Sequence, residues 1–93
     1  MSAKIMTLHP QGKMGVSIDH AKYEQMRGAI ISAVEVRGTL SFTEMIRMIR
    51  DAVDGEFDGS IEWYATTVKL DLEARGELER VRVKGGDAYR IRA

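Results

Sequence analysis

The side chains best suited to chemistry are five basic residues that alternate with apolar ones near the end of the 93-residue chain. The guanidinium group of arginine binds phosphate through paired hydrogen bonds, so a row of arginines suits an anionic backbone. Alternation with a period of two is typical of β-strands. The residues expected to bind phosphate in this segment are Arg80, Arg82, Lys84, Arg90 and Arg92.

The two alternating runs are joined by Gly85-Gly86, which predicts a β-hairpin over about residues 78–92. A three-residue loop from Gly85 to Asp87 keeps the apolar side chains on one face and the arginines on the other. Directly opposed like charges cost about 0.2–1 kcal/mol per pair, which favours an anionic partner. The alternative is that acidic neighbours or water neutralise the arginines. The expected pairs are Val83 with Tyr89, Val81 with Ile91, Arg82 with Arg90, and Arg80 with Arg92.

Two other segments contain ion-binding residue types, but their spacing favours simpler interpretations. The run from Asp54 to Gly59 begins like a calcium loop, yet Ala65 occupies the position that needs a bidentate glutamate. The segment from His9 to Gly15 matches neither nucleotide-binding fingerprint. We therefore expect an acidic turn and a loop, with Lys13 as one further contact to a nucleic acid.

The sequence predicts no enzyme, metal site, cofactor or small-molecule substrate. His9 and His20 lack the spacing of metal ligands. Ser17 has His20 three residues away but no acid to complete a catalytic set, so we expect it to cap a helix. The absence of cysteine excludes disulfides and thiolate ligands and favours a reducing compartment.

The composition suits one compact domain, expected in the cytoplasm. Hydrophobic residues make up 44% of the chain, yet no apolar run reaches membrane-spanning length, so no membrane partner is expected. The 14 basic and 14 acidic residues cancel, so no global charge attracts nucleic acid. The distribution is uneven, because both ends of the chain are basic and the middle is acidic.

Apolar residues at helical spacing predict three helices. The first covers residues 19–37 and begins at an N-cap, Asp19. The second covers residues 41–53 and begins with a capping box, Ser41-Phe42-Thr43-Glu44. The third covers residues 60–75, between a serine cap and a glycine. The expected core positions are Tyr23, Met26, Ile30, Ala33, Val34, Met45, Ile49, Ala52, Val53, Ile61, Ala65, Val68 and Leu72.

The remaining segments are short. Residues 1–18 contain the only proline and are expected to form an extended arm, while residues 19–93 form the domain. Thr39-Leu40 is expected to make a single strand-like crossing between the first two helices.

This order of elements resembles a winged helix-turn-helix domain of the α+β class, with the C-terminal hairpin as its wing. The resemblance is closest in LEARGELER, from Leu72 to Arg80, which is similar to the helix–wing junction of winged-helix transcription regulators. The segments HPQGKMG and WYATTVKLDLEARGELER are also similar to a group of short bacterial proteins of unknown function. The first resemblance implies that the chain binds duplex DNA, with the wing on phosphates.

In such a domain the third helix enters the major groove and contacts base edges. The outward polar residues expected to contact DNA on this helix are Thr66, Thr67 and Lys69. Three acidic residues of the same helix would be repelled by phosphate: Glu62, Asp71 and Glu73.

The third helix also has a second apolar stripe, formed by Trp63, Leu70 and Ala74. Either the arm, a second copy of the chain or another protein must cover it. Two functions are therefore expected. The first is a small DNA-binding protein of the transcription-regulator type, as a monomer or homodimer. The alternative is a protein-interaction or dimerisation module that uses the same frame without contacting DNA, with Trp63 and Leu70 as anchors.

Overall fold

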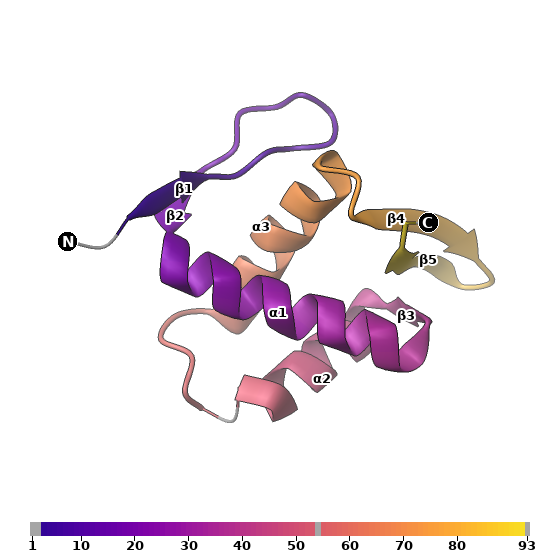
Figure 1. Ribbon diagram of the computed structural model, residues 1–93. Helices are drawn as coiled ribbons and strands as arrows, with labels where there is room; N and C mark the ends of the chain where they lie inside the picture. Colours follow the sequence, from indigo (N-terminus) through magenta and orange to yellow (C-terminus); the bar gives the residue numbers. More distant parts are fainter. Residues whose placement is uncertain (1–2, 54, 93) are drawn as a thin grey trace.

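The computed structural model describes residues 3–53 and 55–92, which form three helices and two small antiparallel sheets (Figure 1). The helices pack together, with one β-hairpin at each end of the described chain. No helix in these residues is long and apolar enough to cross a bilayer. The elements are β1 (Lys4–Met6), β2 (Ser17–Asp19), α1 (His20–Arg37), β3 (Thr39–Ser41), α2 (Phe42–Val53), α3 (Ile61–Ala74), β4 (Leu78–Val83) and β5 (Gly86–Ile91).

Each helix starts and ends within one residue of its predicted range, because local signals define both ends. The Asp19 carboxylate accepts a hydrogen bond from the Lys22 amide at the start of α1. Ser41 and Glu44 form the predicted capping box before α2, with the Glu44 amide 3.2 Å from the Ser41 hydroxyl. The Ser60 hydroxyl accepts from the Trp63 amide at the start of α3.

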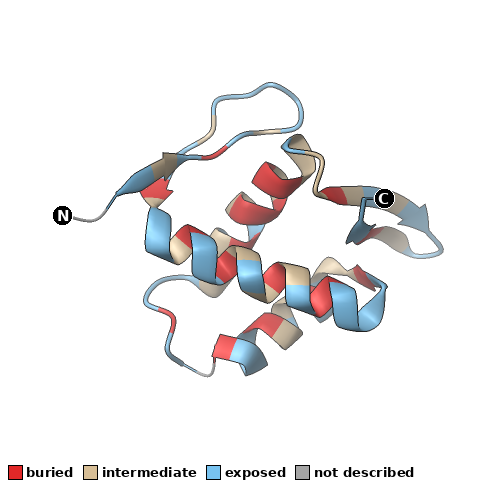
Figure 2. Cartoon of the chain, in the orientation of Figure 1, coloured by how far each residue is buried: buried red, intermediate tan, exposed pale blue. Residues whose placement is uncertain are grey.

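The core lies where the three helices face one another, as the buried residues in Figure 2 show. All of the predicted core positions are buried except Ala52, which is exposed, and Ile61, which is half-buried. The sheet and the loops add further apolar side chains to this core: Ile18, Leu40, Phe57, Leu78 and Tyr89.

The C-terminal sheet has the strand order β3-β5-β4, so the last strand lies in the centre. The short crossing therefore becomes a true strand, with Leu40 opposite Tyr89. Leu40, Tyr89 and Leu78 lie on the face of the sheet that is buried against the helices. The sheet thus fixes the position of the C-terminal hairpin, β4 and β5, relative to α3.

The predicted register of the C-terminal hairpin is wrong. Val83 lies opposite Gly86, so the loop contains only Lys84 and Gly85, and Gly85 has the positive φ of 97° that its turn requires. The pairing differs from the prediction by three residues, and an odd shift changes which side chains share a face. In the observed register, unlike charges lie opposite each other where the prediction placed pairs of arginines. The polar pairs are Glu79 with Arg90, Arg80 with Tyr89, and Arg82 with Asp87.

The N-terminal segment, expected as an extended arm, folds back as a second hairpin. β1 pairs with β2, and the pairing continues at Thr7, whose amide donates to the Val16 carbonyl at 2.9 Å. Ile18 anchors this hairpin, because its side chain is buried in the core. Residues 7–16, called the N-terminal loop below, then extend over α3 (Figure 1).

Candidate functional site

The arginines of the C-terminal hairpin are largely occupied by ion pairs. The Arg80 guanidinium contacts Glu73 at 3.0 Å and lies 3.7 Å from Asp87. Arg90 donates two hydrogen bonds to the Glu79 carboxylate, and this contact lowers the pKa of the Glu79 carboxyl. The predicted row of four free arginines on one face is therefore absent from the described residues.

Three cations of this hairpin segment remain available to a partner. The Arg82 side chain is 85% exposed, although its guanidinium lies 3.7 Å from Asp87. Lys84 at the tip and Arg92 after β5 are exposed, and no ion pair joins either to another described residue. Lys13 is also exposed, but it belongs to the N-terminal loop and so lies on a separate element.

Lys69 does not face outward as expected. Its side chain is only 6% exposed, and its ammonium group donates to Glu73 and to the Tyr89 hydroxyl, each at 3.2 Å. The ammonium also lies 4.5 Å from the centre of the Tyr89 ring. The reason is that α3 packs beside the C-terminal sheet, which encloses Lys69 between Glu73 and Tyr89.

The other residues of α3 that were predicted to contact DNA or a protein differ in exposure: some are exposed to solvent and some are covered. Thr66 is exposed, and its hydroxyl donates to the Glu62 carbonyl at 2.8 Å. Thr67 and Leu70 lie beneath the N-terminal loop, and Ala74 is half-buried. Trp63 keeps 47% of its surface exposed. The loop therefore covers only part of the second apolar stripe.

Asp71, expected on the outer face, is completely buried and joins three parts of the fold. One oxygen accepts from the Leu8 amide at 2.8 Å, which ties the N-terminal loop to α3. The other accepts from the Tyr23 hydroxyl of α1 and from Arg75 Nε at 2.8 Å. Each donor compensates part of the cost of burying the carboxylate, because buried charges need hydrogen-bonded partners.

Replacing Tyr23 with phenylalanine should change the alkaline stability of the protein. Burial, and then the hydrogen bond to Asp71, raise the pKa of the Tyr23 phenol. Below about pH 10 the phenol is neutral in both states, so its contribution to stability is complete. Above that pH the unfolded phenol ionises first, and the free energy of unfolding falls by up to about 1.4 kcal/mol per pH unit.

The test is urea unfolding between pH 8 and pH 11, with Tyr64→Phe as the matched control. Tyr64 is half-buried beside Phe57, and its replacement retains the hydrogen bond from Tyr23 to Asp71, so this variant should keep the wild-type slope. Tyr23→Phe should have a shallower alkaline slope. Equal slopes in the two variants would contradict the assignment.

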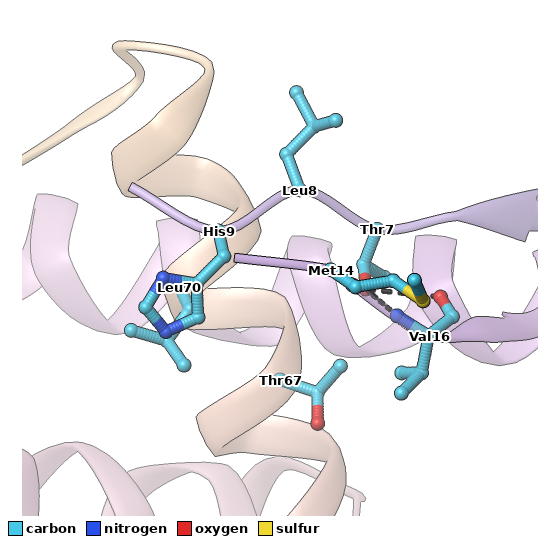
Figure 3. A pocket seen from close by; sticks show the side chains of 8 residues that line it. Thr7, Leu8, His9, Met14, Val16, Thr67 and Leu70 are labelled. Carbon is cyan, nitrogen blue, oxygen red and sulfur yellow. Dashed lines mark hydrogen bonds between the residues drawn. The ribbon is translucent and has the colours of Figure 1, made fainter. Parts of the chain in front are cut away.

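A small cavity separates the N-terminal loop from α3 (Figure 3). Its volume is about 120 Å³. The loop approaches its own backbone closely here, because a side chain on Gly15 would overlap the Thr7 carbonyl. In Figure 3 the Leu8 side chain points away from α3. The lining residues are Thr7, Leu8, His9, Met14, Gly15, Val16, Thr67 and Leu70.

Exposed apolar side chains gather around this cavity. The N-terminal hairpin carries four of the eight large apolar side chains that are exposed in the described chain, including Met14 at 92%. Trp63 lies one helical turn before Thr67 on the same side of α3. We call this area the loop–α3 surface; it consists of Leu8, Met14, Val16, Trp63 and Leu70.

Sequence reasoning predicted part of this surface, since Trp63 and Leu70 were expected at a protein interface and the arm was one expected cover of their stripe. It missed Met14 and Val16, because an arm without periodicity gives no sign of where its side chains pack. In residues 3–53 and 55–92, no three histidine, aspartate or glutamate side chains are close enough to hold a metal ion. Asp54, the first residue of the calcium-like run, lies outside the described residues.

Comparison with known proteins supplies a family and no activity. No curated protein and no solved structure matches the chain. A family model described as "Family of unknown function (DUF6958)" matches residues 4–88, which is most of the chain. The chain therefore belongs to the DUF6958 family.

Proposed function

We propose that this chain is a protein-interaction module on a winged-helix frame, and that the loop–α3 surface is its docking site. Two features support the frame. A two-stranded hairpin directly follows the third helix, and the short strand β3 after α1 pairs with that hairpin. Fold alone does not define function, so the choice of partner rests on the residues of the site.

The observation that carries the proposal is that most polar side chains expected on the outer face of α3 are buried, covered or paired. A base-reading helix needs free polar or basic side chains on that face. Here Lys69 is buried, Thr67 lies under the N-terminal loop, and Glu62 is paired with Arg50 at 2.7 Å. Exposed Trp63 and Met14 occupy this side instead. Clustered exposed apolar side chains usually mark sites of protein association.

The size of the cavity also favours a protein partner. Small-molecule sites commonly have volumes of about 300–1,000 Å³. The cavity between Leu70 and the loop, at about 120 Å³, is smaller than this range. It suits one apolar side chain of a partner. Trp63, one helical turn before the lining residue Thr67, is the residue type that most often dominates interface energetics.

Binding of duplex DNA by the wing, β4 and β5, is the second candidate. The observation in its favour is the high exposure of Arg82 and Lys84 at the tip. With Arg92 they would hold about three phosphates, so the logarithm of the affinity should fall with log salt at a slope near −3. The tip would follow the backbone and read no bases.

Site-specific photo-cross-linking in the native cells tests both proposals. Benzoylphenylalanine would replace Trp63 in the loop–α3 surface, Lys84 at the wing tip, or exposed Arg47 on α2 as the control. We expect a discrete protein adduct from position 63, identified by mass spectrometry, and none from position 47. The proposal fails if position 63 gives no more protein adduct than position 47. A nucleic-acid adduct from position 84 would support the second candidate.

A further inference from the structure

A second apolar surface lies between α1 and α2 and shares no lining residue with the cavity under the N-terminal loop. A groove of about 210 Å³ runs between these helices, and its lining is almost entirely apolar. Val36 at its rim is 76% exposed, so no described part of the chain covers it. We call it the α1–α2 groove; its lining is Ala29, Ser32, Ala33, Val36, Met48 and Ala52.

Gly28 adds an observation that the packing of the single chain does not explain. It lies in the middle of α1, is exposed, and a side chain added there would meet nothing within 4 Å. A glycine inside a helix costs about 1 kcal/mol relative to alanine. It is four residues before Ser32, so it lies on the side of α1 that borders the groove. A close approach by another molecule would account for it.

Acidic side chains border the α1–α2 groove. Glu35 precedes Val36 on α1, while Glu44 and Asp51 lie four residues before and three residues after Met48 on α2. All three are exposed and form no ion pair with a described residue. Arg37 follows Val36 directly at the C-terminal end of α1 and is also exposed, whereas Arg47 precedes Met48 but lies about 100° around α2 from it. Three acids against Arg37 still leave the border of the groove with a net negative charge. An apolar group with cations beside it would therefore complement the groove.

The N-terminal hairpin of the same chain has this complementary chemistry. It carries exposed Lys4 and Lys13, and no acidic residue lies between residues 3 and 18. Met14 follows Lys13 directly. Met14 and Val36 are the two most exposed large apolar side chains of the described chain, and each belongs to one of the two surfaces. Methionine is unbranched and flexible, so it fits irregular apolar gaps.

We propose that a second copy of this chain is the partner, docked head to tail. The N-terminal loop of one copy would insert Met14 into the α1–α2 groove of the next, with Lys13 facing the acidic rim. This inference rests on the proposed function, because it names the occupant of the loop–α3 surface. Two different patches meet in such a contact, so the assembly grows as a ring or a filament. Raised salt should weaken it by screening the rim charges.

Sedimentation velocity on two variants that damage opposite sides of the contact tests this arrangement. Met14→Glu would place an acid against the acidic rim, and Val36→Lys would place a cation against Lys13. The wild type should gain mass as its concentration rises, and each variant alone should lose at least about tenfold in association constant. Their 1:1 mixture should form heterodimers at concentrations where each variant alone is monomeric, since the mixture retains one intact loop and one intact groove. Arg47→Ala is the surface control and should assemble like the wild type.

A wild type that remains monomeric at every concentration overturns the inference. Self-association that persists in both variants would also overturn it, because the contact would then lie elsewhere. A mixture that forms no dimer would overturn it as well, because a symmetric contact would behave in that way. The variants change exposed residues, and thermal unfolding would verify that they fold. The proposed function fails separately, through the adducts at position 63. A protein adduct from a different protein there, with a monomeric wild type, would sustain the function and remove the second copy.

Discussion

Replacing Asp71 with alanine is expected to lower the free energy of unfolding by about 3–5 kcal/mol, the usual cost of removing one partner from a buried charged network. Asp71 has no exposed surface and accepts from the Leu8 amide, the Tyr23 hydroxyl and Arg75. Alanine would leave all three donors without an acceptor, and an unsatisfied buried group costs about 1–3 kcal/mol. Arg75 is partly exposed and can regain some hydration, so the cost stays below the sum of three such penalties.

Urea unfolding measures this loss, and amide hydrogen exchange at Leu8 shows where it acts. Glu62→Ala is the matched control, because Glu62 is an acid on the same helix whose pair with Arg50 is exposed on both sides. Exposed pairs contribute at most about 1 kcal/mol. The assignment of Asp71 as a structural junction is refuted if its variant stays within 1 kcal/mol of this control. Exchange at Leu8 should accelerate in Asp71→Ala and not in Glu62→Ala.

Asp71 also illustrates what the sequence could not predict. The apolar spacing of Ala65, Val68 and Leu72 identifies the inward side of α3, and it placed the charged neighbours Lys69 and Asp71 outside. Both are buried, because their partners Tyr89 and Tyr23 come from elements 20 and 48 residues away along the chain. Local periodicity carries no information about such partners. Caps and helix ends were predictable because every group that defines them lies within a few residues.

The register of the C-terminal hairpin was wrongly predicted for a related reason. Alternation from Arg80 to Arg92 predicts two strands, but it does not decide which residues face each other. The register is set by contacts outside the hairpin, since Tyr89 must lie beside Leu40 of β3 and face the core. The charge pair of Glu79 with Arg90 follows from that choice. Arg80 and Arg90 are paired with acids that the fold itself supplies, Glu73 and Glu79.

Replacing Gly15 with alanine should detach the N-terminal loop from α3 while leaving the three-helix core intact. A Cβ atom on Gly15 would lie 1.8 Å from the Thr7 carbonyl oxygen, whereas ordinary contact begins near 3.4 Å. The two backbone segments must separate, which breaks the hydrogen bonds that join Thr7 to Val16. Overpacking of this kind costs about 1–3 kcal/mol. Unfolding by urea and hydrogen exchange at Thr7 and Leu8 would measure the loss.

Gly12→Ala separates the effect of this clash from that of an altered loop glycine. Gly12 belongs to the same loop and has a φ of 74°, but a side chain there would meet nothing within 4 Å. It should cost about 1–2 kcal/mol through backbone strain alone, with the contact between Thr7 and Val16 preserved. Slow exchange at Leu8 in both variants would contradict the loop geometry. If the loop carries Met14 to a second copy, Gly15→Ala should also abolish self-association, and Gly12→Ala should retain it. The N-terminal loop, expected from the sequence as part of an arm that covers the third helix or contacts nucleic acid through Lys13, would then link the stability of the fold to its function.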